Sequence, residues 1–152
     1  MKKIILSILV CGFMVLGLTG CGTSKNEFTV GKESNIEIVE KGVTLSIKEN
    51  TLTTTGATLI LKNDSDVDVQ YGNPYEMEIK KDGEWHKINV ELNFTLPAFV
   101  LKSKETKEWE FSWENGYGKL TSGDYRIIKS IDIEKEDGTF DTFYVSAEFT
   151  IE

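Results

Sequence analysis

Apolar residues recur at every second position through most of the chain from residue 36 onward, and this period is typical of a β-strand with one buried face. Polar turn residues separate the apolar runs, and no segment beyond residue 20 shows the 3.6-residue apolar stripe of an amphipathic helix. The pattern predicts about seven or eight short strands in an all-β, antiparallel sandwich. The clearest runs lie at residues 43–47, 57–61, 75–79, 85–90, 109–113, 125–133 and 143–151.

One short motif narrows the choice of sandwich. Leu120, Gly123 and Tyr125 have the spacing of a tyrosine corner, in which a turn leads into a late strand and the phenol hydroxyl bonds a nearby backbone group. The motif stands at the entry to the second-to-last expected strand, where immunoglobulin-like (Ig-like) sandwiches place it. We therefore expect an Ig-like sandwich in which Tyr125 is structural.

The N-terminus has a different character from the rest of the chain. Lys2 and Lys3 precede a run of uncharged residues at positions 4–18. This run is shorter than the ~20 residues of a membrane-spanning helix, but it fits the apolar region of a secretory signal peptide. The alternative is an N-terminal anchor helix that is never cleaved.

The residues that follow this run favour cleavage. Residues 18–21, Leu-Thr-Gly-Cys, resemble the bacterial lipoprotein box. The resemblance implies that the Cys21 sulfur receives a diacylglyceryl group and that the chain is cut before Cys21. Cys11 would leave with the signal peptide, so the mature domain would contain no disulfide. Two or more acyl chains give stable attachment to a bilayer, which predicts a lipid-anchored protein on the extracytoplasmic face of the cell membrane.

These features divide the chain into three parts. We expect a lipoprotein signal peptide at 1–20, a lipidated N-terminus with a flexible tether at 21–34, and the Ig-like β-sandwich at 35–152. The tether is assigned because its residues are small, polar or charged and show no sustained period. An edge strand that begins near Phe28 and Val30 is the alternative.

The charge balance excludes some classes of partner. The chain has 17 basic and 25 acidic residues, a net charge of −8. Loss of Lys2 and Lys3 with the signal peptide would change the net charge to −10. Such a chain lacks the basic stripe that nucleic acids require, and it does not favour electrostatic docking on anionic lipid. Arg126 is the single arginine, so an arginine cluster for phosphate is also excluded.

Residues from about 51 to 151 resemble the bacterial Ig-like domains found on secreted lipoproteins of Gram-positive-type bacteria. The resemblance rests on the segments 56–63, 71–72, 82–85 and 117–126, of which the last is the most specific. Ser122 departs from the proline that the family usually has before the corner glycine. The resemblance implies the fold and an extracytoplasmic location, and no activity. The late-strand pattern is also distantly similar to that of Ig-like bacterial proteinase inhibitors.

Catalytic chemistry finds little support. His86 is the only histidine, and it lies on a polar strand face without the nucleophile and carboxylate that a triad needs. Glu108 and Glu110 are two residues apart on one expected strand, which is what a solvated strand face gives by default. We therefore expect no catalytic residues and no cofactor.

A metal site is also not expected. Asp64, Asp66 and Asp68 alternate in an expected turn, but the segment lacks the glycine and the bidentate glutamate of an EF-hand loop. An acidic turn between two strands explains the three residues. Weak calcium binding shared with Asp137 or Asp141 is the alternative.

Aromatic residues leave a choice between core and binding site. Trp109, Phe111 and Trp113 share one strand face, where they could pack the core or form a sugar-stacking platform. Loops at 70–74, 93–99 and 113–117 carry aromatic residues and prolines that turn chemistry alone does not require. The large apolar residues of 93–99 could instead plug one end of the sandwich.

Recognition in such sandwiches usually uses loops, so the candidate ligand-binding residues are Tyr71, Trp113 and Tyr117. We expect Tyr71 and Tyr117 to be exposed. The function predicted from these observations is that of a non-catalytic binding or interaction domain, with a protein or a cell-wall glycan as partner. The alternative function is that of a proteinase inhibitor.

Overall fold

The computed structural model describes residues 28–152. The expected signal peptide, the lipid attachment at Cys21 and the first half of the expected tether, residues 21–27, lie outside the described residues. Within them, no helix is both long enough and apolar enough to cross a membrane. The elements are β1 (Thr29–Glu33), β2 (Val43–Ile47), β3 (Gly56–Asn63), β4 (Val69–Tyr71), β5 (Glu76–Lys81), β6 (Glu84–Asn89), β7 (Phe99–Leu101), β8 (Thr106–Ser112), α1 (Glu114–Tyr117), β9 (Gly123–Glu134) and β10 (Phe140–Ile151).

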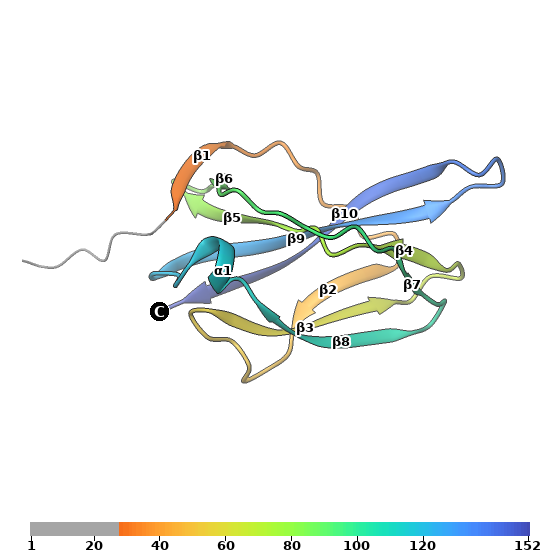
Figure 1. Ribbon diagram of the computed structural model, residues 1–152, viewed down its shortest axis with the longest axis horizontal. Coiled ribbons are helices and arrows are strands. Elements are labelled where there is room, and N and C mark those ends of the chain that lie inside the picture. Colours follow the sequence, from red (N-terminus) through yellow and green to blue (C-terminus); the bar gives the residue numbers. More distant parts are fainter. Residues whose placement is uncertain (1–27) are drawn as a thin grey trace, which may run out of the picture.

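The strands form two sheets that lie one above the other (Figure 1). The larger sheet has the order β1-β6-β5-β9-β4-β7, and β10 pairs with β9 along its whole length. The smaller sheet has the order β2-β3-β8. Each pairing between these strands is antiparallel. This arrangement confirms the all-β, antiparallel, Ig-like class predicted from the sequence.

The core lies between the two sheets and follows the two-residue period of the strands. In β3 and β10 alternate residues are buried, because successive side chains point to opposite faces of a sheet. In β9 residues 125–129 are all buried. The tyrosine corner forms as expected: Tyr125 is fully buried, and its hydroxyl donates a hydrogen bond of 2.9 Å to the carbonyl oxygen of Thr121. The principal core residues of the strands are Leu45, Leu59, Leu61, Met77, Ile79, Leu101, Tyr125, Ile127, Ile131, Phe143 and Val145.

The described residues form more strands than the sequence pattern predicts. β4 and β7 have three residues each, which is too short to show an alternating pattern. β1 lies in the segment 21–34 assigned to the tether, and it is the edge strand near Phe28 and Val30 that the sequence analysis gave as the alternative. Thr29 pairs with Asn89 and Val30 with Ile88 of β6. A polar segment can still add to a sheet edge, since backbone hydrogen bonds do not depend on an apolar face.

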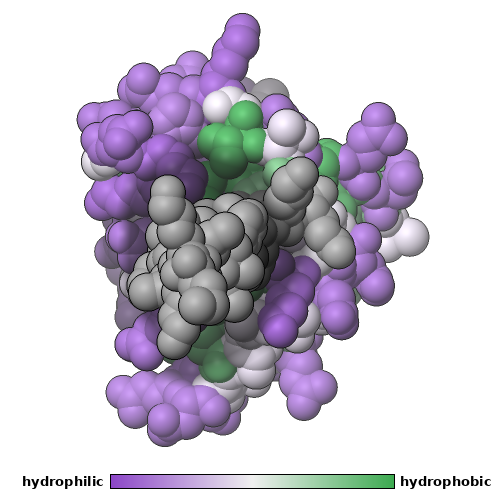
Figure 2. All heavy atoms as spheres, turned by 90° about the vertical axis from the view of Figure 1, so that its left-hand side faces the viewer, coloured by the Kyte–Doolittle hydropathy of each residue, from purple (hydrophilic) through white to green (hydrophobic). Residues whose placement is uncertain are grey.

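The outer face of the larger sheet contains a buried ion pair. Glu78 of β5 lies opposite Arg126 of β9, and the Arg126 side chain contacts one carboxylate oxygen at 2.6 and 2.7 Å. The ring of Trp85 covers the guanidinium at 4.7 Å. At the end of the molecule where β1 begins, the described surface is largely hydrophilic, with apolar residues visible only in separate small areas (Figure 2).

Candidate ligand-binding cleft

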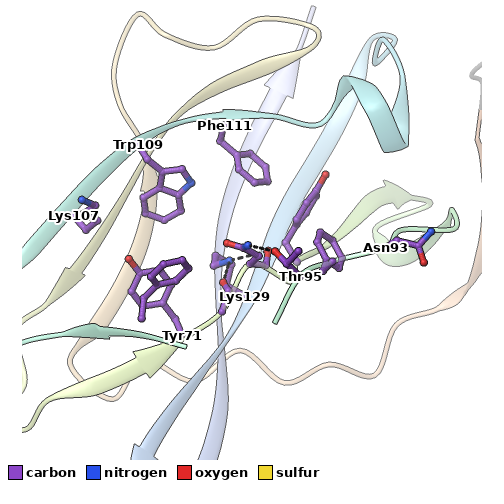
Figure 3. Close-up of a pocket in the computed structure, with 12 residues that line it drawn as sticks. Tyr71, Asn93, Thr95, Lys107, Trp109, Phe111 and Lys129 are labelled. Carbon is purple, nitrogen blue, oxygen red and sulfur yellow. Dashed lines mark hydrogen bonds between the residues drawn. The ribbon is translucent and has the colours of Figure 1, made fainter. Parts of the chain in front are cut away.

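A cleft of about 640 Å³ opens between the two sheets, beside their edge strands β7 and β8. Its walls come from β8, from β4 with the loop that follows it, and from the extended segment before β7 (Figure 3). The volume falls within the range of small-ligand pockets, roughly 300–1,000 Å³. The lining residues are Tyr71, Gly72, Asn73, Tyr75, Asn93, Phe94, Thr95, Phe99, Lys107, Trp109, Phe111 and Lys129.

The aromatic side chains of the cleft form two groups. In the first group, the Tyr71 ring lies 5.4 Å from Phe99 and is nearly parallel to Trp109 at 6.2 Å. In the second, Tyr75 contacts Phe111 edge-on at 4.6 Å and Phe94 at 5.3 Å. Such edge-to-face and offset arrangements are the favoured geometries of aromatic pairs.

Lys129 lies at the floor of the cleft, at an inward position of β9 between Ile127 and Ile131. Its ammonium donates hydrogen bonds to the carbonyl oxygens of Gly72 at 2.8 Å and Pro74 at 3.1 Å, with that of Asn73 at 3.5 Å. Burial lowers the pKa of Lys129 to about 8, because a low-dielectric site disfavours the charged form. Lys129 therefore fixes the loop that forms one wall of the cleft.

A second bond joins this wall to its neighbour. The side-chain amide of Asn73 donates to the hydroxyl of Thr95 at 3.0 Å (Figure 3). Residues 72–74 and the segment before β7 are therefore tied together at the polar side of the cleft. The opposite side is apolar and is formed by Trp109 and Phe111 of β8.

The electrostatic character of the cleft differs from that of the whole chain. Lys107 and Lys129 line it, and no acidic side chain of the described residues does. Lys107 is exposed and forms no ion pair within 4.0 Å in residues 28–152. In a chain with a net charge of −8, the cleft is thus lined by cationic side chains alone, although the carboxylate of Glu105 acts on Tyr71 from outside the lining.

The tyrosines of the cleft are held in their neutral form. Burial raises the pKa of Tyr75 to about 12. Burial also raises the pKa of Tyr71, and the nearby carboxylate of Glu105 adds to this effect. Both phenols therefore remain hydrogen-bond donors throughout the physiological range of pH.

Of the three candidate ligand-binding residues, the structure places only Tyr71 in the cleft. The expected exposure of Tyr117 and of a loop patch at Trp113 is wrong, since their exposed fractions are 3% and 0%. The indole nitrogen of Trp113 donates to the carbonyl oxygen of Thr54 at 3.0 Å. The Tyr117 hydroxyl accepts the backbone N–H of Met77 at 3.1 Å. The short helix α1 turns both rings into the core, and the sequence contains no helical period that would show this.

For Trp109, Phe111 and Trp113 the sequence allowed either a place in the core or a sugar-stacking platform. The structure gives the three residues different surroundings. Trp113 belongs to the core, whereas Trp109 and Phe111 are half-buried and line the cleft. Phe94 packs into the cleft, but Leu96 and Phe99 are exposed, so the expected plug is incomplete. Lys129 was missed, although its place among alternating apolar residues of 125–133 marks it as an inward lysine.

The three aspartates considered as a weak calcium site form ion pairs with lysines instead. Asp64, Asp66 and Asp68 pair with Lys62, Lys104 and Lys102 at 2.8, 2.8 and 3.0 Å, respectively. In the described part of the chain, no cluster of three or more histidine, cysteine or acidic side chains is arranged to hold a metal ion.

Residues on the strands are likewise engaged in local contacts. Glu108 pairs with Lys48 at 2.7 Å, and Asp141 pairs with Lys41 at 2.6 Å. The Nδ1 atom of His86 lies 3.3 Å from the carbonyl oxygen of Gly31. This histidine therefore contacts β1, the edge strand of the larger sheet.

The two-sheet sandwich, the tyrosine corner and the absence of regular helices beyond α1 within residues 28–152 define an Ig-like domain. Residues 39–150 match the family model described as "Bacterial Ig-like domain". The chain belongs to this family, as the sequence resemblance predicted.

Comparisons with individual proteins add little to this assignment. No curated protein matches the chain. Among solved structures, the ASH / PapD-like domain of human CEP192 (PapD-like domain 7) is similar over 80% of this chain and 98% of that chain. The sequence identity is 14% and the TM-score is 0.34, and no functional argument is drawn from this similarity.

Proposed function

We propose that this protein is a lipid-anchored protein of the extracytoplasmic membrane surface whose Ig-like domain binds a partner molecule in the aromatic cleft, without catalysis. The observation that carries the proposal is the cleft itself. Six aromatic side chains border an open volume of about 640 Å³. A concave, mostly apolar site with a few polar groups is the usual form of a ligand site.

The packing of the sandwich supports this interpretation. Apolar side chains gain roughly 25 cal/mol for each Å² removed from water, so a cleft of half-buried aromatic rings leaves stabilisation unused. A ligand that covers Trp109, Tyr71 and Phe99 would recover it. The cleft walls are also held in place by Lys129 and by the bond between Asn73 and Thr95, and a preorganised site loses less entropy on binding.

The anchoring half of the proposal rests on the sequence. The basic start, the uncharged run at 4–18 and the box that ends at Cys21 all agree with a bacterial lipoprotein. Such attachment would hold the domain at the membrane surface, where it could meet cell-wall glycans and exported proteins.

A capture experiment tests the binding site. The full-length protein, purified in mild detergent and immobilised, is exposed to solubilised peptidoglycan, a glycan array and pools of synthetic peptides. Trp109→Ala is compared with the control variant Phe140→Ala. Phe140 is an exposed aromatic residue at the hairpin between β9 and β10, and it lines none of the described cavities. The proposal expects Trp109→Ala to lose bound material and Phe140→Ala to retain it.

Equal capture by both variants, or none by the unchanged protein, would contradict the proposal. Stoichiometric inhibition of a secreted protease that persists in Trp109→Ala would instead favour the proteinase inhibitor. Leu96, in the extended segment before β7, is 82% exposed and lies outside the cleft, so Leu96→Ala is the variant that tests a protease contact independent of the cleft.

A further inference from the structure

The edge strands of the two sheets differ in what they expose. β8 carries Glu108 and Glu110 among its exposed residues, and β1 carries Lys32 and Glu33. β2 has the polar residues Thr44 and Ser46 between its buried ones. Charged and polar side chains of this kind protect a sheet edge from pairing with other chains.

β7 lacks this protection. It closes the larger sheet on one side, with Val69, Gln70 and Tyr71 of β4 as its partners. Val100 is 54% exposed and Phe99 is 41% exposed, and Leu96 in the preceding segment is 82% exposed. Among the described strands β7 pairs with β4 alone, and the carbonyl oxygen of Leu101 also accepts a hydrogen bond from the Asn63 side chain at 3.2 Å. An edge strand with exposed apolar side chains is a template for strand addition.

The free edge of β7 is continuous with the aromatic cleft. Phe99 lines the cleft and contacts the Tyr71 ring, whereas Leu101, two residues further on, lies in the core. Alternate residues of a strand added beside β7 would face the same side as Phe99. Their side chains would point toward Trp109 and the open volume of the cleft.

We infer that the partner is an extended apolar segment of another protein, which pairs with the free edge of β7 and inserts a side chain into the aromatic cleft. This inference rests on the proposed function and gives it a ligand class. The segment carries a carboxylate near the inserted side chain, because Lys107 lies unpaired beside Trp109 and no acidic residue of the described chain lines the cleft.

Charge also distinguishes this partner from a second copy of the same chain. Two copies with a net charge of −8 each repel one another. A foreign segment can instead place its own carboxylate at Lys107. The main-chain hydrogen bonds along β7 give affinity, and the cleft selects the inserted side chain, which is the general logic of recognition by strand addition.

The test uses the full-length protein in detergent and a defined probe. The probe is a pool of short synthetic peptides with valine, leucine or phenylalanine at alternate positions, threonine between them and one aspartate. Val100→Lys places a charge on the free edge, and Val67→Lys is the matched control, because Val67 is 47% exposed in a turn outside the cleft. We expect peptide affinity to fall at least tenfold in Val100→Lys and to change less than twofold in Val67→Lys.

Backbone methylation tests the pairing itself. In an extended peptide the N–H groups of alternate residues point to opposite edges. Two further pools carry N-methyl groups on the odd or on the even residues, and only one of these pools should lose binding. Loss from both pools or from neither would overturn the strand-addition geometry.

The remaining outcomes separate this inference from the proposed function. Peptide binding that is lost in Trp109→Ala but unchanged in Val100→Lys overturns the inference and leaves the cleft as a binding site. Binding of glycans alone to the cleft has the same consequence. Concentration-dependent dimerisation that disappears in Val100→Lys would identify a second copy as the occupant of β7. Binding that neither variant affects would contradict both proposals.

Discussion

Lys129 occupies a strand position at which the neighbouring inward residues, Ile127 and Ile131, are fully buried. The lysine is 3% exposed, and its ammonium is satisfied by backbone carbonyls of residues 72–74. An ammonium kept in such a place costs free energy, which appears as its lowered pKa. The same hydrogen bonds fix the loop at residues 72–74, which forms one wall of the cleft. The free-energy cost of burying this ammonium therefore accompanies the formation of the candidate site.

The lowered pKa predicts how stability changes with pH. In the unfolded chain Lys129 keeps its proton up to about 10.5, whereas in the folded protein it loses it near pH 8. Between these values the unfolded state binds more protons, so the free energy of unfolding rises with pH. Urea denaturation between pH 8 and about 9.5 should show a gain on the order of 1–2 kcal/mol that Lys129→Met lacks.

The pH range of this experiment ends below pH 10, because tyrosines of the unfolded chain begin to lose their protons there. The pKa of Tyr75 is raised to about 12, so above pH 10 the folded state retains a proton that the unfolded state has lost, and stability falls. Equal pH profiles for the unchanged protein and Lys129→Met would contradict the assigned cost of the buried ammonium.

Tyr125 gives a second prediction for a single residue. Tyr125→Phe removes the hydrogen bond to the Thr121 carbonyl and leaves the ring in the core. We expect a loss of about 0.5–1.5 kcal/mol in the free energy of unfolding. Tyr144→Phe is the control, because Tyr144 is exposed, and it should change stability by less than about 0.5 kcal/mol. A Tyr125→Phe variant as stable as the control would remove the structural role of the corner.

At the scale of elements, the pair formed by Glu78 and Arg126 joins β5 to β9 in the middle of the larger sheet. Removing the arginine alone would leave the fully buried Glu78 carboxylate without its cation. Arg126→Met should therefore destabilise the domain by about 3–5 kcal/mol, while the double variant with Glu78→Met should recover most of that loss. Urea denaturation of the single and double variants measures both effects.

An exposed ion pair provides the comparison. Lys48, in the loop between β2 and β3, pairs with Glu108 of β8 at the surface. The distance from its ammonium to the carboxylate oxygen, 2.7 Å, is similar to that of the buried pair. Lys48→Met should cost at most about 1 kcal/mol, because water screens an exposed pair. If Arg126→Met costs no more than Lys48→Met, the buried pair does not stabilise the contact between β5 and β9.

The alternating pattern predicted the positions of the long strands well, and β3 and β10 bury alternate residues as expected. It did not show that β5 and β9 also bury residues of their outer face, among them Glu78 and Arg126. It could not predict the three-residue strands β4 and β7, which have too few positions for a period. It also could not predict β1, whose pairing with β6 depends on backbone bonds rather than on an apolar face.

The candidate site was predicted only in part, for related reasons. Tyr71 was identified because a loop tyrosine needs an explanation, and it does line the cleft. Trp113 and Tyr117 were chosen for the same reason, as aromatic residues near a loop, but at the ends of α1 both side chains are buried. Alternation places Trp109 and Phe111 on an inward face, yet it cannot show that the space in front of them is open. That depends on how far the two sheets diverge beside β7 and β8.

At the scale of the whole molecule, the proposed lipid anchor would hold a chain with a net charge of −8 at the membrane surface. The described surface at the end where β1 begins is largely hydrophilic (Figure 2). We expect the mature protein to begin at Cys21 with acyl chains on that residue. Mass spectrometry of protein extracted from membranes should show a Cys21 N-terminal peptide with the added lipid mass. An unmodified Cys21, or a chain that still begins at Met1, would contradict the anchor.

The central claim is that ligands bind in the aromatic cleft, and the three tryptophans offer a direct test of it. Trp109 lines the cleft, Trp85 covers Arg126 on the outer face, and Trp113 is bonded to Thr54 inside the core. Their indole N–H resonances can be followed by nuclear magnetic resonance while peptide pools or peptidoglycan fragments are added to the full-length protein in detergent. The account predicts the largest shift at Trp109 and none at Trp85. A saturable shift at Trp85 with Trp109 unmoved would place the binding site elsewhere and contradict the claim.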